Sequence, residues 1–169
     1  MPLRQIVCAC ALLFYAGTAF AQEPAKPVQA VIKASVAGKE YFDPHSLLTF
    51  FSLGFTRDLT TALVKTKARG DEIFIDWDPI TGGQDGCGPK DISYKSGPKG
   101  AKTTVTVQFT EMYCFGSGTQ PIKVTVLFDM VREGTAPDLS YTIDDIRHVD
   151  KAGKTVDSLR EAFKALSTD

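Results

Sequence analysis

The stretch KTTVTVQFTEMYC, Lys102 to Cys114, decides the fold because its side chains alternate between apolar and polar. Val105, Val107 and Phe109 fall on one side of the chain, and the residues on the other side are Thr104, Thr106, Gln108 and Thr110. Successive side chains of a strand point to opposite faces of a sheet. The alternation therefore predicts a strand with one buried face and one exposed face.

Two later segments continue this pattern. PIKVTVLFDMV (residues 121–131) alternates in the same way, and LSYTIDDIRHV (residues 139–149) predicts the strand that follows it. DISYKSGPKG (residues 91–100) predicts a short extended piece that ends in a Gly-Pro-Lys-Gly turn, and residues 73–77 also alternate like a strand. Consecutive strands joined by short turns predict an antiparallel sheet with one buried face.

Helical spacing marks the chain before the strands and after them. A first helix is expected from Pro27 to Gly38, and a second is expected to have Asp43 as its N-cap and Pro44 as its first residue. TRDLTTALVKTKARG (residues 56–70) predicts a third helix after a break near Gly54. TVDSLREAFKAL (residues 155–166) predicts a C-terminal helix that Thr155 caps and whose apolar stripe begins at Val156. Helices grouped on one face of an antiparallel sheet give an α+β fold.

The N-terminus has the pattern of a cleaved export signal. Arg4 precedes the apolar run IVCACALLFYAG, and Thr18-Ala19-Phe20-Ala21 ends in a small-residue cleavage pattern. We expect residues 1–21 to be a signal peptide and residues 22–169 to form one domain in the periplasm. An uncleaved anchor and a lipoprotein signal at Cys10 are the alternatives; the apolar run is shorter than the approximately 20 residues that span a bilayer.

Cleavage would remove Cys8 and Cys10 and leave Cys87 and Cys114 in the mature chain. Two cysteines in an oxidising compartment suggest one disulfide, and two free thiols are the alternative. A bridge would close a loop of about 27 residues and stabilise the fold by about 3.5 kcal/mol.

Composition excludes several classes of function. The chain has a formal net charge of -1, and its charged residues are mixed along the sequence without a basic stripe, which excludes a nucleic-acid partner. It contains only two histidines, His45 and His148, and lacks Cys-x-x-Cys and His-x-x-His spacings, so no metal or other cofactor is expected. We expect His148 to lie at the surface and His45 in the first turn of a helix.

The segment IDWDPITGGQDGCGP (residues 75–89) gathers the candidate site residues, which are Asp76, Trp77, Asp78, Gln84 and Asp85. A calcium loop would use their oxygen atoms, but an EF-hand has ligands at alternate positions and a final glutamate, which this loop lacks. Asp76 and Asp78 on one face of a strand could form an acid–base pair. The structural interpretation is a turn held by aspartate side chains, with Trp77 in the core.

The late strand LSYTIDDIRHV, with Tyr141 before Ile143-Asp144-Asp145-Ile146, resembles the last strand of the nuclear-transport-factor-2-like, or cystatin-like, superfamily. YFDPHSLLTFFS followed by IDWDPITGGQD is more specifically similar to a family of small exported bacterial proteins, domain of unknown function 3828. The resemblance implies a cone-shaped α+β fold that often dimerises through its sheet. It implies no catalytic residues.

These observations predict an exported soluble domain that acts by binding and not by catalysis. The expected partner is a periplasmic protein, with an immunity or inhibitor role as one form of this, or a small apolar ligand. The aromatic side chains that could line its cavity are Phe50, Phe51, Phe55, Trp77, Phe109 and Phe128. No membrane span is expected after signal cleavage. The alternative is a cone-fold isomerase, dehydratase or hydrolase that uses Asp76 or Asp78 as its acid or base.

Overall fold

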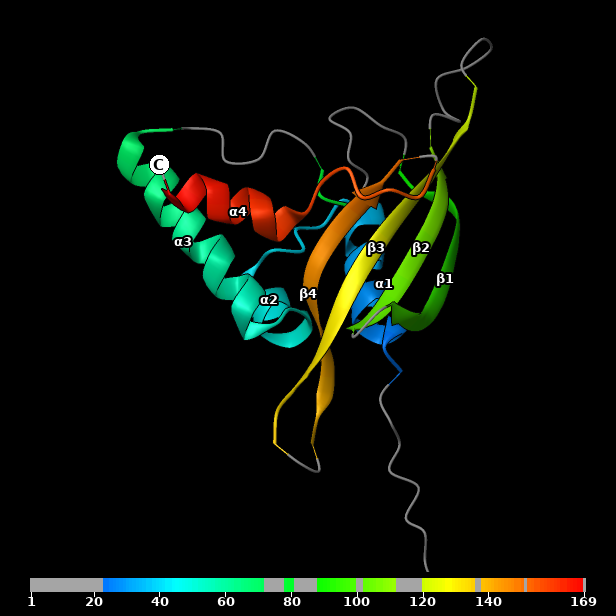
Figure 1. The fold of residues 1–169 in the computed structure, drawn as a ribbon, viewed down its shortest axis with the longest axis horizontal. Helices are drawn as coiled ribbons and strands as arrows, with labels where there is room; N and C mark the ends of the chain where they lie inside the picture. Colours follow the sequence, from blue (N-terminus) through cyan, green and yellow to red (C-terminus); the bar gives the residue numbers. More distant parts are fainter. Residues whose placement is uncertain are drawn as a thin grey trace, which may run out of the picture.

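The computed structural model describes residues 23–71, 78–80, 88–99, 102–111, 120–135, 138–150 and 152–168. These residues form helices and strands in the order shown in Figure 1. The elements are α1 (Ala25–Val36), α2 (Pro44–Phe50), α3 (Leu53–Arg69), β1 (Lys90–Lys99), β2 (Lys102–Glu111), β3 (Ile122–Glu133), β4 (Ser140–Val149) and α4 (Leu159–Thr168).

Several predictions fall outside the described residues. They are the signal peptide and its cleavage after Ala21, the strand at residues 73–77, the disulfide between Cys87 and Cys114, and the positions of Asp76, Trp77, Gln84 and Asp85.

The four strands form one antiparallel sheet in the order β1-β2-β3-β4. In the register of this sheet Val107 pairs with Val126, and Val126 pairs with His148, so all three side chains point to the same face. Val105, Val107 and Phe109 are buried on that face, as their alternation predicts. The other face of β2 carries Thr104, Thr106, Gln108 and Thr110.

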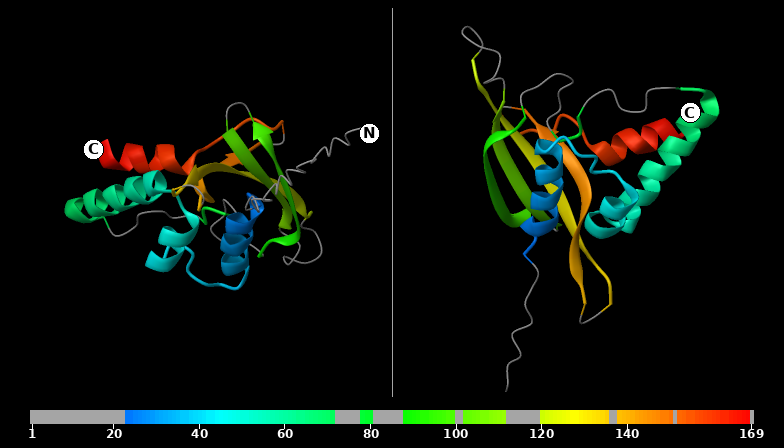
Figure 2. Two further views of the ribbon diagram at one scale, coloured as in Figure 1. Left: turned by 90° about the horizontal axis from the view of Figure 1, so that it is seen from below. Right: turned by 180° about the vertical axis from the view of Figure 1, so that it is seen from behind.

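Among the described residues, helices cover the concave face of the curved sheet. Figure 2 shows α1 and α2 against the concave face, while α3 and α4 pack along each other beside β4. An aromatic cluster joins these layers: the ring of Phe55 stacks on Phe51 at 4.7 Å between centroids and meets Phe163 edge-on at 5.4 Å. We call the opposite, convex side of the sheet the open face.

The start of α3 differs from the prediction. The helix begins at Leu53, and its N-cap is Ser52, whose hydroxyl accepts a hydrogen bond from the backbone N–H of Phe55 at 2.9 Å. Gly54, expected as the break, lies inside the helix. A Cβ at Gly54 would lie 3.3 Å from a guanidinium nitrogen of Arg160, so the glycine permits a close approach of α4.

The C-terminal helix begins later than predicted. Thr155 does not cap it, because Thr155 forms a bridge with Val149 at the edge of β4. The hydroxyl of Ser158 instead accepts from the N–H of Glu161 at 3.2 Å, and the sequence Ser-Leu-Arg-Glu is a capping-box pattern. Val156, expected in the apolar stripe, is exposed.

The Gly97-Pro98 pair was predicted as part of a turn, but it lies inside β1 and pairs with Thr104 and Thr103. Proline has no backbone N–H to donate. An edge strand such as β1 tolerates proline because the sheet has no strand on its outer side that would need this hydrogen bond. The chain turns back only after Lys99, which pairs with Lys102.

The structure confirms an α+β class with a curved four-stranded antiparallel sheet. The N-cap at Asp43 is also confirmed, since its carboxylate accepts from the N–H groups of His45 and Ser46. Within the part of the chain that the structure describes, every helix is too short or too polar to cross a membrane.

Candidate functional site

Asp78 is the one candidate site residue of the predicted loop that lies among the described residues. Its Oδ1 accepts a hydrogen bond from the backbone N–H of Ile80 at 2.6 Å and one from the phenol of Tyr41 at 3.2 Å. The first bond is the aspartate turn that the structural interpretation expects. The second joins Asp78 to the segment between α1 and α2. Burial, and then the Asp78 charge, raise the pKa of Tyr41, so this phenol stays protonated.

Glu111 ends β2 on the face that also carries Val107 and Phe109. It is only 7% exposed, and its Oε1 has no hydrogen-bond partner among the described residues. Burial raises the pKa of this carboxyl, the Asp78 carboxylate raises it further, and His148 acts in the opposite direction. A buried carboxyl beside a second carboxylate holds its proton to a higher pH than a glutamate in water.

His148 was expected at the surface, and that prediction is wrong: the residue is 7% exposed. Its pairing with Val126 turns the side chain to the covered face of the sheet. The ring Nδ1 lies 2.7 Å from Oδ1 of Asp157, and the same oxygen accepts from the backbone N–H of His148 at 3.1 Å. Asp157 thereby fixes the ring orientation.

Asp78, Tyr41, Glu111 and His148 come from separate parts of the chain. Together they supply a carboxylate, a phenol, a buried carboxyl and an imidazole, which are the groups that transfer protons in general acid–base chemistry. Sequence reasoning singled out Asp78 but missed Glu111. The available signal was its position, since residue 111 continues the apolar series 105, 107, 109 with a carboxyl group.

We expect Glu111→Gln to remove a pH dependence of stability. Because the folded protein holds the Glu111 proton to a higher pH than the unfolded chain does, the free energy of unfolding falls as pH rises through that window. Glutamine cannot ionise, so the variant should gain stability relative to the wild type as pH rises above the ordinary glutamate range. Thermal unfolding of both proteins over a pH series measures this difference.

Glu161→Gln is the matched control, because Glu161 lies on the exposed side of α4 and pairs only with Lys164. Its stability difference from the wild type should stay nearly constant over the same pH series. If the stability difference between Glu111→Gln and the wild type also stays constant with pH, Glu111 does not hold its proton to a higher pH in the folded protein.

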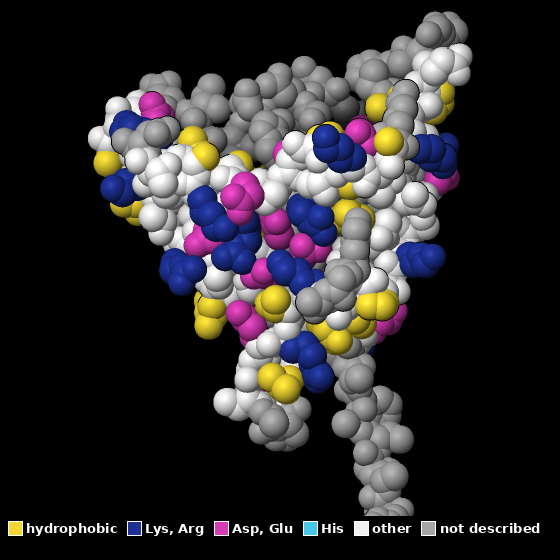
Figure 3. Space-filling model, viewed as in Figure 1, with side chains coloured by type: hydrophobic (Ala, Val, Ile, Leu, Met, Phe, Trp, Pro, Cys, Tyr) yellow, Lys and Arg dark blue, Asp and Glu magenta, His cyan; other side chains and the backbone are white. Residues whose placement is uncertain are grey.

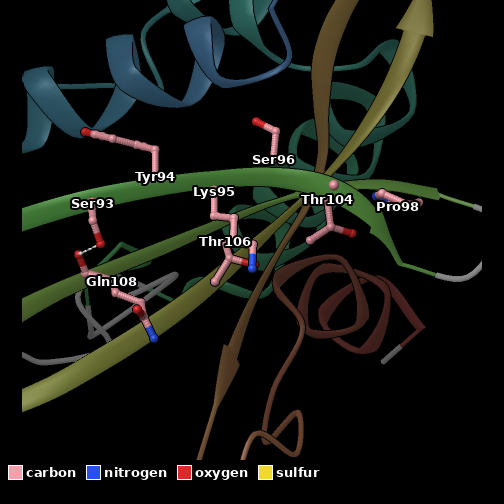
Figure 4. Close-up of a pocket in the computed structure, with 9 residues that line it drawn as sticks. Ser93, Tyr94, Lys95, Ser96, Pro98, Thr104, Thr106 and Gln108 are labelled. Atoms are coloured by element: carbon pink, nitrogen blue, oxygen red, sulfur yellow. Dashed lines mark hydrogen bonds between the residues drawn. The ribbon is translucent and has the colours of Figure 1, made fainter.

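The open face carries a groove of about 570 Å³ over β1 and β2. Figure 4 shows that Ser93, Lys95, Thr106 and Gln108 point away from α1, whereas Tyr94 points towards it. The groove is lined by hydroxyl, amide and ammonium groups. Such groups suit a polar ligand or the polar surface of a partner.

A second groove, of about 770 Å³, continues over β3 and the end of β4. The two grooves share Gln108, whose amide donates to the hydroxyl of Thr125 at 3.2 Å. Beside it, Lys123 donates to the hydroxyl of Thr110 at 2.8 Å. The open face therefore carries two adjoining hollows, and the second combines polar Gln108, Lys123 and Thr125 with apolar Pro121 and Val149.

The Ile-Asp-Asp-Ile motif of β4 anchors helices. Asp144 accepts from Arg160 and from the hydroxyl of Ser52, both at 2.8 Å. Asp145 accepts from the hydroxyl of Ser158 at 2.7 Å and from the backbone N–H of Arg160 at 3.1 Å. Figure 3 shows acidic and basic side chains gathered where α3 and α4 meet the sheet. These carboxylates are occupied by structural contacts.

Metal binding has no support within the described residues, where no three histidine or acidic side chains are placed to hold an ion. Comparison with family models, with curated proteins and with solved structures finds no match for this chain.

Proposed function

We propose that this chain is an exported binding protein and that a partner protein docks on the open face. The observation that carries the proposal is the face of β1–β3 that no described helix covers, with two grooves joined at the exposed Gln108. Helices lie against the other face, whereas Lys95, Gln108 and Lys123 are exposed on the open face. An immunity or inhibitor role is one form of this function, and a second copy of the chain is one form of partner.

The packing of the aromatic side chains favours a protein partner over a small apolar ligand. Phe55, Phe109 and Phe128 were candidates to line an apolar cavity, but each is completely buried in the core. Phe51 is 2% exposed and stacks on Phe55. Side chains that fill a core in this way leave their rings unavailable to a ligand.

We expect a photo-crosslinking residue at position 108 to capture the partner. The Gln108 side chain lies where the two grooves meet, so a protein covering the open face would contact it. The variant is expressed in the exporting cells, irradiated, and separated on a denaturing gel, where one discrete adduct is expected.

The same crosslinker at Thr61, on the exposed surface of α3, serves as the matched control and should give no such adduct. Equal adducts from both positions, or none from position 108, would argue against docking on the open face.

An acid–base enzyme is the second candidate, favoured by the hydrogen bond between Tyr41 and Asp78 beside the buried Glu111. In this function Asp78 is the base and Glu111 is the acid; Asp76 lies outside the described residues. Asp78→Asn should abolish turnover in a screen of isomerase, dehydratase and hydrolase substrates, and Tyr41→Phe should weaken it. If Asp78→Asn only lowers the melting temperature, the enzyme proposal fails.

A further inference from the structure

The open face presents cations and hydrogen-bond donors. In its middle row, which crosses all four strands, Lys95 pairs with Thr106 and Leu127 pairs with Arg147. Thr106 and Leu127 pair with each other between them. In a neighbouring row Lys90 pairs with Thr110, and Thr110 pairs with Lys123. The side chains of Lys95 and Lys123 are exposed.

Two carboxylates on the same face, those of Asp129 and Asp145, are already occupied. Asp129, 5% exposed, accepts from Arg147 at 2.6 Å and from the hydroxyl of Thr104 at 3.1 Å. Asp145 is buried and bonded to Ser158 and to backbone N–H groups. The face therefore shows its cations to solvent and keeps these carboxylates inside.

Asp150 is the exposed acid that lines the second groove, and its Oδ1 accepts from the backbone N–H groups of Ala152 and Lys154. Within the described residues Lys95 and Lys123 form no ion pair, and Lys123 bonds only the Thr110 hydroxyl. These two ammonium groups can therefore each pair with an anionic group of a partner. They can do so although the formal net charge of the whole chain is -1.

We propose that the protein docking on the open face presents an acidic surface, whose carboxylates meet Lys95 and Lys123 across the grooves joined at Gln108. This inference rests on the proposed function and specifies the partner. Exposed charges of opposite sign attract across an interface and orient the encounter, like charges repel, and salt screens both effects. Binding should therefore weaken steeply with ionic strength.

Poly-L-glutamate is the probe for this surface, and amide chemical shifts of the ¹⁵N-labelled chain report where it binds. We expect shifts at low salt confined to open-face residues of β1, β2 and β3, and their loss at about 0.15 M salt. Lys95→Glu with Lys123→Glu should reduce the affinity about tenfold or more, because two attractive contacts become repulsive.

Lys33→Glu with Lys65→Glu is the matched control: it makes the same change in net charge on exposed positions of α1 and α3, away from the open face. It should leave the affinity within about twofold of the wild type. An equal loss in this control, shifts spread over the helices, or no binding by the wild type would overturn the proposal.

Polygalacturonate tests the other source of carboxylates. If it binds the open face while poly-L-glutamate does not, the partner is an anionic polysaccharide and the acidic-protein proposal is overturned. The failure of the proposed function can be told apart from this. An adduct at position 108 without polyglutamate binding would mean that a protein docks on the open face but is not acidic. The absence of any adduct at position 108 would argue against a protein partner altogether.

Discussion

Phe55→Ala is expected to destabilise the protein by about 3–5 kcal/mol, the usual cost of truncating a fully buried phenylalanine to alanine. The Phe55 side chain is 0% exposed. Its ring contacts Phe51 from α2's end, Phe163 of α4 and, at 5.9 Å between centroids, Phe42. Removing it would open a cavity where three helices and the sheet meet. Urea unfolding followed by circular dichroism measures the loss.

Phe50→Ala makes the same chemical change five positions earlier, at a partly exposed side chain that packs against the rim of the core. A smaller loss, about 1–2 kcal/mol, is expected because less apolar surface leaves water there on folding. Equal losses for the two variants would mean that the aromatic cluster is not the centre of stability.

The strands were predictable because their pattern is local. Alternation with a period of two depends only on neighbouring residues, and Val105, Val107 and Phe109 are buried as it predicts. The Asp43–Pro44 helix start was predictable for the same reason, since the carboxylate caps N–H groups two and three residues ahead. Those parts of the fold follow from short-range chemistry.

Long-range contacts decide the parts that sequence reasoning missed. Thr155 leaves the helix because it bridges to Val149, and His148 is buried because β4 pairs it with Val126. Glu111 becomes notable only when the fold brings Asp78 near it, more than thirty positions away in sequence. Local sequence patterns carry no information on which distant residues meet. The grouping of Tyr41, Asp78, Glu111 and His148 therefore could not be predicted from the sequence.

The role of the Asp144–Asp145 pair of β4 also depends on long-range contacts. The sequence marked Asp144 and Asp145 as part of a strand motif, and the strand is confirmed. Their role depends on Arg160, fifteen or more positions later, whose guanidinium reaches Asp144 at 2.8 Å and Asp58 of α3 at 2.7 Å. One arginine of α4 thus joins the sheet to α3.

Arg160→Leu is expected to cost about 3 kcal/mol at neutral pH, because it removes the nearest cation from two largely buried carboxylates and leaves each with only a longer ion pair to an exposed side chain. The side chains of Asp58 and Asp144 are 11% and 13% exposed. Burial alone would raise the pKa of Asp58, but the hydrogen bond and charge of Arg160 outweigh it and hold the pKa below its usual value. The Asp58 contribution is therefore present above the ordinary aspartate range and is lost as pH falls through the lowered pKa.

The stability difference between the wild type and Arg160→Leu should accordingly be greatest near neutral pH and shrink in acid, where the Asp58 carboxylate becomes protonated. Asp58→Asn added to Arg160→Leu should recover part of the loss, since it removes one uncompensated charge. Arg57→Leu is the matched control: Arg57 also pairs with Asp58, at 3.3 Å, but its side chain is 74% exposed. An exposed pair contributes less than about 1 kcal/mol. If Arg57→Leu costs as much as Arg160→Leu, or if the Arg160→Leu difference does not change with pH, then the buried arginine is not what fixes α4 and α3 to the sheet.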